Sequence, residues 1–440
     1  MSNTINNDFY SVSIDGKIAQ YLDSYKIHRD IEEKIVIPED VISKDGAVLT
    51  HTYPLSTIQS TCLSQNSEVF ESTGIIHDGD YPATINRATQ IPSLPFFRSF
   101  DLIPFPPPLK TRFTFIDLFA GIGGFRLGMQ RHGGECLYSS EWDRGARQVY
   151  FANYGEVPFG DITLKSTKSY IPEKFDLLSA GFPCQPFSIS GKMKGFEDTR
   201  GTLIYDVFEI IDHYRPKVVM LENVKHLRYH DKGQTLKVIL HSLREMGYYT
   251  EWCVLNASNF GVPQNRERII IMATLKRPFI WDKLKKVNNK SVILRDILET
   301  NSEERFEYLD EPYTLIDQSD VTVQKSGLIF VGYLNKKIRG NGVRPGTNHL
   351  SRVHKQPNRI YSSQGVHPAI PSQETSGRFW ILDEGKVRKL TVLECYRLMG
   401  FPDNFIKSSS ISEQYRQIGN SVAVPMVEAI IKELQEQDFI

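Results

Sequence analysis

The feature that most constrains the fold is a short apolar run that ends in a glycine-rich turn. The run Phe113–Phe119 is followed at once by Gly121-Ile122-Gly123-Gly124, and a helix-like stretch then reaches Arg131. Glycine lets the backbone turn sharply and approach another group closely. We therefore expect a strand, a tight turn and a helix, the unit from which α/β sheets are built.

Further apolar runs have the length of buried strands, and helical patterns lie between them. The expected strands are Leu137–Ser140, Phe175–Ala180, Val218–Leu221 and Ile269–Ala273, and the expected helices include Thr202–His213, Gln234–Met246 and Val422–Gln435. Strands that alternate with helices predict βαβ units. The predicted fold class is α/β, with a doubly wound, mostly parallel, Rossmann-like sheet.

Composition places the domain boundaries. Residues 1–80 carry thirteen acidic and five basic side chains, and the proline-rich stretch from Ile91 to Pro108 resists both helix and sheet. Beyond Lys276 the alternation of strands and helices is lost, and it resumes near Lys389. The four expected parts are an acidic N-terminal extension, an α/β domain, a smaller domain that is mostly β or irregular, and a C-terminal return to the α/β domain, at residues 1–108, 109–280, 281–387 and 388–440.

Charge and cysteine distribution narrow the class of protein. The formal net charge is zero, but residues 321–373 contain eight Lys/Arg and no Asp/Glu, a distribution that favours nucleic-acid binding. The five cysteines form no C-x-x-C pair, so neither a zinc site nor a disulfide framework is expected. No apolar run reaches about 18 residues and the N-terminus does not resemble a signal peptide, so we expect a cytoplasmic protein.

The glycine-rich turn and a later acidic residue predict a nucleoside site. Glu141 ends the second expected strand, about 20 residues after Gly121, where a carboxylate can bind ribose hydroxyls. The turn reads Gly-x-Gly-Gly and lacks the third glycine of pyrophosphate-binding turns. Taken alone, it fits any cofactor that contains a nucleoside, and a nucleoside without a pyrophosphate fits better.

Cys184 is the candidate nucleophile. It lies in Gly181-Phe182-Pro183-Cys184-Gln185-Pro186-Phe187-Ser188, directly after the expected strand Phe175–Ala180. Ligand chemistry in a doubly wound sheet takes place beyond the carboxyl ends of the strands. A cysteine between two prolines there favours a reactive thiol over a packing cysteine, which is the ordinary role of a lone Cys.

Glu222 follows the next expected strand and therefore projects from the same edge as Cys184. One chemistry uses both groups: a thiolate adds to carbon 6 of cytosine, and a carboxyl group supplies a proton or strong hydrogen bond to ring N3. Carbon 5 then becomes nucleophilic. Without Cys184, a charged strand end that meets solvent would explain Glu222 equally well.

Two arginines, Arg266 and Arg268, lead into the last expected strand within Gln264-Asn265-Arg266-Glu267-Arg268. Residues two apart on an extended segment face the same side. One guanidinium could bind the cytosine O2 and the other a phosphate or carboxylate. Surface charge pairing is the alternative interpretation.

Together these elements resemble the C5-cytosine DNA methyltransferases over roughly residues 113–430. The match is specific because the motifs occur in the family's order, and no catalytic position is altered. The matching segments are Phe115–Gly124, Gly181–Ser188, Glu222-Asn223-Val224, Gln264–Arg268, Arg388–Pro402 and Gln417–Val422.

The resemblance implies a role for each matched residue. Cys184 would be the nucleophile, Glu222 would contact cytosine N3 and Arg268 would contact O2, while Asn223 and Arg266 support that geometry. Glu141 would bind the ribose and Asp161 the adenine amino group of S-adenosylmethionine, which would leave as S-adenosylhomocysteine, with no metal involved. The expected cofactor-site residues are Phe119, Gly121, Gly123, Glu141, Trp142, Asp161, Ile162, Pro183, Leu203, Asn420 and Val422.

The resemblance also implies double-stranded DNA as the partner and residues 281–387 as a target-recognition domain. A mobile loop with Ser190 and Lys192 would close over DNA, and Gln356 would fill the hole left by the flipped cytosine. Arg352 and Arg359 would contact the DNA. The region is similar to those of enzymes that read GGNCC or GGWCC, so we expect a site of this kind. The resemblance to the family also leads us to expect a monomeric restriction-modification enzyme, paired with a restriction endonuclease.

Rival interpretations remain open. An RNA cytosine-5 methyltransferase could use the same motifs, although the long basic region between Arg268 and Arg388 favours DNA. A DNA-binding regulator with incidental methylation is disfavoured because the acidic N-terminal extension has no visible helix-turn-helix. A dehydrogenase does not fit the missing third glycine or the pairing of Cys184 with Glu222.

Overall fold

The computed structural model describes residues 103–183, 203–285, 292–300, 306–336, 346–372 and 378–440, together with the backbone of two short antiparallel strands, β1 (Phe9–Ser11) and β2 (Lys34–Val36). Three of the candidate residues, Cys184, Ser190 and Lys192, lie outside the described residues. The remaining candidates can be placed in the fold.

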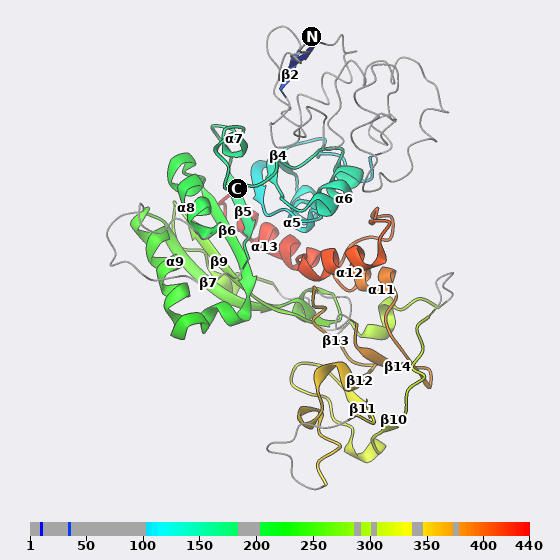
Figure 1. The fold of residues 1–440 in the computed structure, drawn as a ribbon. Coiled ribbons are helices and arrows are strands. Elements are labelled where there is room, and N and C mark those ends of the chain that lie inside the picture. Colours follow the sequence, from blue (N-terminus) through cyan, green and yellow to red (C-terminus); the bar gives the residue numbers. More distant parts are fainter. Residues whose placement is uncertain are drawn as a thin grey trace.

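A six-stranded sheet forms the centre of the α/β domain (Figure 1). Strands β4, β3, β5 and β6 run parallel, whereas β9 is antiparallel to both of its neighbours, β6 and β7. The expected mostly parallel α/β sheet is therefore confirmed. The strands, in spatial order, are β4 (Gly134–Ser140), β3 (Phe113–Leu118), β5 (Leu177–Gly181), β6 (Val218–Val224), β9 (Glu267–Thr274) and β7 (Tyr249–Asn256).

Strand β7 was not expected from the sequence. It lies at the edge of the sheet, and its exposed Tyr249, Glu251 and Trp252 interrupt the apolar pattern that marks a buried strand. Strand β9 follows β7 after a short connection, residues 257–266, in which the chain turns back. It therefore lies antiparallel between β6 and β7.

Helices cover both faces of the sheet, which makes it doubly wound. On one face, α8 (Leu203–Tyr214) and α9 (Gln234–Glu245) pack against a cluster that includes Leu178. On the other, α5 (Gly124–Gln130) and α13 (Val424–Glu436) pack against a cluster that includes the adjacent Leu177. The alternation between Leu177 and Leu178 follows from the two-residue period of a strand.

A third apolar cluster lies beside the sheet and joins three helices to α5. It contains residues of α6 (Arg144–Tyr154), α11 (Val392–Arg397) and α12 (Ile411–Asn420). A four-residue helix, α7 (Lys165–Lys168), lies in the connection from α6 to β5. The C-terminal residues thus return to the α/β domain.

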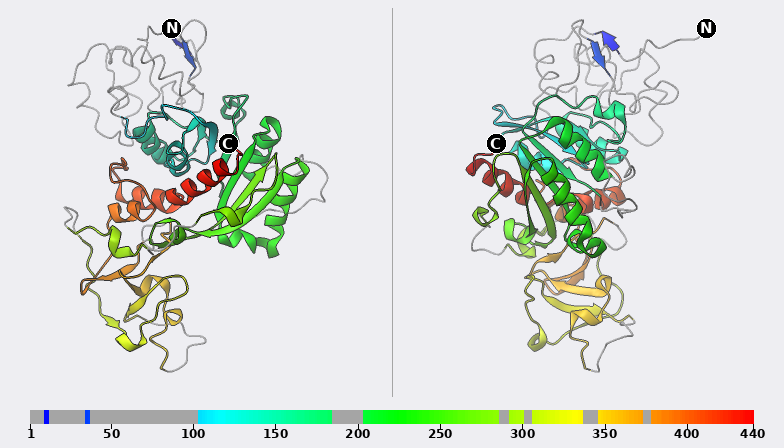
Figure 2. Two further views of the ribbon diagram at one scale, coloured as in Figure 1. Left: turned by 180° about the vertical axis from the view of Figure 1, so that it is seen from behind. Right: turned by 90° about the vertical axis from the view of Figure 1, so that its left-hand side faces the viewer.

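A five-stranded sheet forms a second body, which lies below the six-stranded sheet in both views of Figure 2. Its small apolar cluster is separate from those of the larger domain. The expectation of a smaller, mostly β domain is therefore confirmed. Its strands, in spatial order, are β10 (Tyr313–Leu315), β11 (Phe330–Leu334), β12 (Arg359–Ser362), β14 (Trp380–Asp383) and β15 (Lys386–Arg388).

Short elements join the two bodies. Strand β8 (Gln264–Asn265) pairs in parallel with β13 (His367–Pro368), so the segment before β9 is bonded to the segment after β12.

The 3-10 helices of the described residues lie at Lys225–Arg228, His230–Gly233, Ala257–Phe260, Trp281–Lys283, Leu294–Ile297, Gln318–Asp320, Ser351–Val353 and Gln356–Asn358.

The motif Arg388–Pro402 organises the start of α11. Thr391 caps the helix through a bond from the Glu394 amide, and the Glu394 carboxylate accepts the Thr391 amide in return. Arg388 donates to both oxygens of the same buried carboxylate, at 2.9 and 2.8 Å. A buried charge is tolerated when it is paired and hydrogen-bonded in this way. The motif therefore fixes β15 to α11.

The last residues of the proline-rich stretch contact the α/β domain. The Phe105 amide donates to the Asn153 carbonyl at 3.0 Å, and the Phe105 ring stacks on Phe405 with centroids 5.7 Å apart.

Among the helices of the described ranges, none is long and apolar enough to cross a membrane.

Candidate functional site

The candidate catalytic residues that the structure describes gather at the carboxyl edge of β5 and β6. Gly181, the last residue of β5, is in register with Glu222 of β6. A β-carbon built on Gly181 would lie 3.6 Å from Oε2 of Glu222. Since Cys184 follows Gly181 by three residues, its segment leaves the sheet beside the Glu222 carboxyl group.

Glu222 and Arg268 form a largely buried ion pair, with 3.0 Å between Oε1 of Glu222 and Nε of Arg268. Glu222 is only 9% exposed. Burial raises the pKa of Glu222 above its ordinary value, and the guanidinium groups of Arg268 and Arg266 offset this rise only in part. A carboxyl group in this setting holds its proton more readily than a free one, so it can act as a proton donor.

Asn223 holds the start of the cysteine segment. Its Nδ2 donates to the carbonyl of Phe182 at 2.9 Å, and its Oδ1 accepts the amide of Val224 at 2.8 Å. Both side-chain groups are therefore engaged with backbone. Asn223 thus positions the chain just before Pro183, and its supporting role in catalysis stays a prediction.

Arg266 differs from Arg268 in what it contacts. It lies at the break between β8 and β9, and its guanidinium donates to the carbonyls of Ile370, Gly419 and Ser421 at 3.0, 2.9 and 2.7 Å. Gln264 is also fully buried and bonds backbone of Ile370 and Leu398. Arg266 therefore acts on the site indirectly. Its guanidinium fixes the backbone of three neighbouring segments, and its positive charge lowers the pKa of Glu222.

The glycine-rich turn has the conformation that its glycines permit. Phe119, Gly121 and Gly123 have φ values of 58°, 56° and 85°, in the left-handed region that favours glycine. A β-carbon on Gly121 would meet nothing within 4 Å, so open space borders the turn at that residue. A ligand can therefore approach this backbone closely.

Glu141 is bonded to the same turn. Its Oε2 accepts the Gly121 amide at 2.8 Å and its Oε1 accepts the Asp143 amide at 2.7 Å. Burial raises the pKa of Glu141, and these two backbone donors lower it by less. The carboxylate thus fixes the turn relative to the end of β4, and its contact with ribose hydroxyls stays a prediction.

Other expected cofactor residues border this region. Trp142 is 78% exposed, so its ring is accessible to a ligand. The Glu141 amide donates to the Phe159 carbonyl, which brings the segment with Asp161 and the buried Ile162 alongside. Oδ1 of Asp161 accepts the amide of Thr163 at 2.9 Å.

The C-terminal motif reaches the other side of the turn. A β-carbon on Gly124 would lie 2.9 Å from Cγ2 of the buried Val422, and Asn420 is exposed at the end of α12. Pro183 is exposed two residues beyond β5, and Leu203 begins α8. An exposed aromatic ring, a buried carboxylate and open backbone fit an adenosine-containing cofactor such as S-adenosylmethionine.

One contact near this site was not expected from the sequence. Arg416 of α12 pairs with Asp143, with 2.6 Å between Nη1 and Oδ2, and Asp143 also caps α6 by accepting the Ala146 amide. An Asp directly before the first residue of a helix, as Asp143 is before Arg144, is a sequence signal for the cap. Its partner on α12, more than 270 residues away, requires the fold.

In the five-stranded domain, the expected DNA-contacting residues differ in their surroundings. Arg352 and Gln356 are exposed on 3-10 turns before β12. Arg359 is half-buried, and its Nε and Nη2 donate to the His354 carbonyl at 3.1 and 2.9 Å. The His354 ring in turn stacks on Tyr333, with centroids 4.0 Å apart. Arg359 is thus part of the domain's packing, and its contact with DNA stays a prediction.

The basic surface is also partly neutralised from outside the stretch 321–373. Lys336 pairs with Glu311, with 2.6 Å between Nζ and Oε2. Throughout the described part of the chain, no group of three or more His, Cys, Asp or Glu side chains is placed to hold a metal ion.

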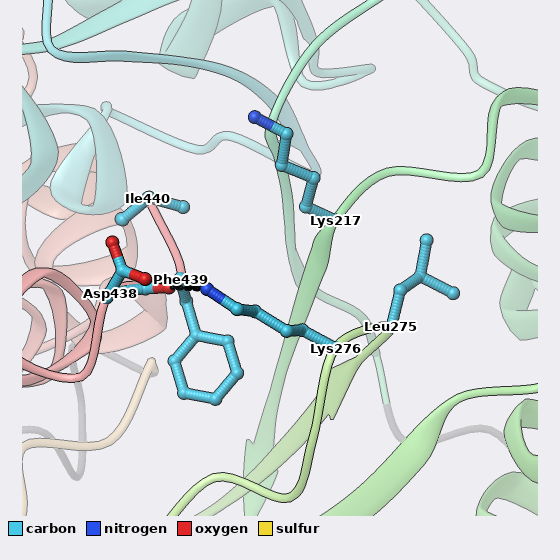
Figure 3. Close-up of a pocket in the computed structure, with 6 residues that line it drawn as sticks. All are labelled: Lys217, Leu275, Lys276, Asp438, Phe439 and Ile440. Carbon is cyan, nitrogen blue, oxygen red and sulfur yellow. Dashed lines mark hydrogen bonds and ion pairs between the residues drawn. The ribbon is translucent and has the colours of Figure 1, made fainter.

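A pocket of about 430 Å³ lies at the opposite edge of the sheet (Figure 3). Lys217 precedes β6 and Leu275 and Lys276 follow β9, so these residues mark the end of the strands away from Glu222. Lys276 pairs with Asp438 at 2.6 Å across the pocket. None of the candidate site residues lines it.

Comparison with known proteins agrees with the geometry. Residues 113–436 match the profile of the family described as C-5 cytosine-specific DNA methylase. The chain is 45% identical over 336 residues to the type II methyltransferase M.HpaII of Haemophilus parainfluenzae, covering 75% of this chain and 91% of that protein. It is 42% identical over 328 residues to M.HhaI of Haemophilus parahaemolyticus, covering 73% and 93%.

Solved structures show the same fold at lower sequence identity. The Dnmt2 methyltransferase of S. pombe has a TM-score of 0.51 at 18% identity, covering 74% of this chain and 99% of that one. The methyltransferase EhMeth of Entamoeba histolytica has a TM-score of 0.52 at 18% identity, with the same coverage.

Proposed function

Since the chain belongs to the C-5 cytosine-specific DNA methylase family, we propose that it methylates carbon 5 of a cytosine flipped out of a short duplex site, with S-adenosylmethionine as methyl donor. In the cell it would protect that site from a cognate restriction endonuclease. The observation that carries the proposal is the buried Glu222–Arg268 pair next to Gly181, where the segment of Cys184 leaves the sheet.

The proposed reaction begins with the Cys184 thiolate, which adds to carbon 6 of the flipped cytosine. Glu222 gives its proton to ring N3, so the electron pair of the 5,6 double bond becomes available at carbon 5. Arg268 holds O2 of the base and stays paired with the Glu222 carboxylate that results. Carbon 5 takes the methyl group, and S-adenosylhomocysteine is the leaving group. A base then removes the carbon 5 proton, the 5,6 double bond re-forms as the thiolate leaves from carbon 6, and N3 returns its proton to Glu222.

S-Adenosylmethionine supplies an electrophilic methyl group on a sulfonium. Glu141 would bind its ribose hydroxyls, Trp142 would stack on its adenine, and Asp161 would accept a bond from the adenine amino group. The open space at Gly121 supports close approach of the rest of the cofactor to the backbone. The raised pKa of Glu222, at the same edge of the sheet as the turn at Gly121, supports proton transfer and methyl transfer close together.

The five-stranded domain would hold the target duplex and read its sequence. Flipping a base costs a few kcal/mol, and filling the resulting hole offsets part of that cost. Gln356 is exposed on a surface turn, which supports that role, and Arg352 is exposed one turn before it. We propose a G/C-rich palindrome, GGNCC, with one cytosine methylated on each strand.

Bisulfite sequencing of plasmid DNA after incubation with the full chain and S-adenosylmethionine tests this proposal. The expected result is conversion-resistant cytosine at a single short motif, in wild type and not in Glu222→Ala. A parallel incubation with transfer RNA tests the rival substrate. Labelling of RNA without labelling of DNA, or methylation spread over all cytosines, would contradict the proposed function.

A further inference from the structure

A buried tyrosine lies directly behind the glycine-rich turn. Tyr154 is the last residue of α6 and is fully buried. Its hydroxyl donates to the Gly123 carbonyl at 2.7 Å. The carbonyl also accepts the Leu127 amide at 2.9 Å, as the first bond of α5. The Tyr154 hydroxyl therefore joins α6 to the junction between the turn and α5.

The ring of Tyr154 also determines which residue can occupy position 123. A β-carbon on Gly123 would lie 2.3 Å from Cε2 of Tyr154, far inside van der Waals contact. The glycine is thus required both by its φ of 85° and by the ring beneath it. Gly121 contrasts with it, since the space next to that residue is open. One glycine of the turn faces a ligand site and the other faces Tyr154.

Tyr154 is itself held on several sides. The Arg126 guanidinium lies 4.7 Å from its ring centroid and pairs with the buried Glu156 at 2.8 Å. The Tyr150 ring is 4.7 Å away and the Phe105 ring 6.0 Å away, measured between centroids. Burial raises the pKa of Tyr154, so the hydroxyl keeps its proton and remains a donor. A ring packed in this way offers a rigid support.

We propose that Tyr154 is a positioning residue for cofactor binding, which sets the backbone of Gly121–Gly124 in the conformation that S-adenosylmethionine requires. The inference rests on the proposed function for the identity of the ligand. Glu141 holds the turn from the cofactor side through the Gly121 amide, and Tyr154 holds it from behind through the Gly123 carbonyl. Without the second contact, the turn samples other conformations and the cofactor must order it on binding.

Tyr154→Phe in the full chain tests the proposal, with Tyr150→Phe as a matched control. Both substitutions remove one buried hydroxyl from α6. The Tyr150 hydroxyl accepts a bond from Arg126 at 3.0 Å and lies 3.8 Å from the Cys136 sulfur, whereas the Tyr154 hydroxyl bonds the turn. A hydrogen bond worth about 0.5–1.5 kcal/mol predicts an increase of about two- to twelvefold in the dissociation constant of S-adenosylhomocysteine for Tyr154→Phe. The KM for S-adenosylmethionine should rise similarly, with kcat and DNA affinity unchanged.

Hydrogen exchange of the Gly121–Gly124 amides without cofactor gives a readout that does not depend on the reaction. We expect faster exchange in Tyr154→Phe than in wild type and in Tyr150→Phe. Equal exchange rates in the two variants, or equal losses of affinity, would overturn the positioning role. Wild-type protein that binds no S-adenosylhomocysteine would instead refute the proposed function, while the exchange comparison would still decide the role of Tyr154.

Discussion

Replacing Glu222 with glutamine should separate its chemical role from its structural one. Glutamine has nearly the same volume, and its side-chain oxygen can still accept the bond from Nε of Arg268. The substitution therefore leaves no cavity and no unpaired guanidinium. What it removes is the transferable proton, since an amide can donate a hydrogen bond to cytosine N3 but cannot protonate it.

General acid catalysis contributes about 10²–10⁴-fold in rate. The amide retains part of the interaction with N3, so we expect kcat to fall by about 10²–10³-fold, or about 2.7–4 kcal/mol in the activation barrier.

Because burial raises the pKa of Glu222, its ionisation costs stability in the folded protein. The proton on Glu222 stabilises the folded protein fully when the pH is below the pKa of this residue in the unfolded chain, about 4.3. That stabilisation is lost as the pH rises through the pKa of Glu222 in the folded protein. The Tm of Glu222→Gln relative to wild type should therefore increase with pH.

Single-turnover transfer of a labelled methyl group to duplex DNA measures the effect on rate, and calorimetry measures cofactor affinity. Glu267→Gln is a matched control, because Glu267 starts the same strand as Arg268 and pairs with Lys225 at the surface. A half-exposed pair of this kind contributes about 0–1 kcal/mol. The control should keep wild-type activity. Activity of Glu222→Gln within tenfold of wild type, or an equal loss in the control, would refute the assignment of Glu222 as the acid.

Two further predictions concern cofactor and DNA. Glu141→Gln should weaken the binding free energy of S-adenosylmethionine by about 1–3 kcal/mol, because an amide cannot accept both the Gly121 and the Asp143 amides while binding ribose hydroxyls. Unchanged affinity by calorimetry would move the ribose contact elsewhere. Arg352→Ala should reduce the discrimination between DNA sequences by about 1–3 kcal/mol without lowering the Tm. Arg359→Ala should lower the Tm, because the Arg359 guanidinium donates to the His354 carbonyl. The opposite pattern in melting and bisulfite assays would reverse the two roles.

The central strands of the sheet could be predicted because they are fully buried. Such strands appear as continuous apolar runs, as Val218–Leu221 and Ile269–Ala273 do. Residues that follow the runs, such as Glu222 and Glu141, could be assigned to the carboxyl edge from topology alone. Strand β7 carries no such signal, because an edge strand alternates irregularly between exposed and buried side chains.

Contacts between distant segments could not be predicted. The bonds from Arg266 to Gly419 and Ser421 span more than 150 residues, and nothing in the local pattern indicates which carbonyls a buried guanidinium will find. The same holds for the Tyr154 hydroxyl, since a tyrosine at the end of an amphipathic helix is ordinarily a core residue. Sequence motifs thus locate the groups that react, and the fold identifies the groups that hold them.

The most direct test of the proposed chemistry is covalent trapping at Cys184. DNA that contains 5-fluorocytosine accepts the thiolate at carbon 6 and the methyl group at carbon 5, but fluorine cannot leave as a proton does, so the enzyme stays attached to the DNA. Wild-type protein with S-adenosylmethionine should form an adduct that survives denaturing electrophoresis, and peptide mapping should locate it at Cys184. Cys184→Ser should form none while binding S-adenosylhomocysteine as wild type does. An adduct that persists in Cys184→Ser, or methylation by wild type with no adduct on fluorinated DNA, would contradict the account.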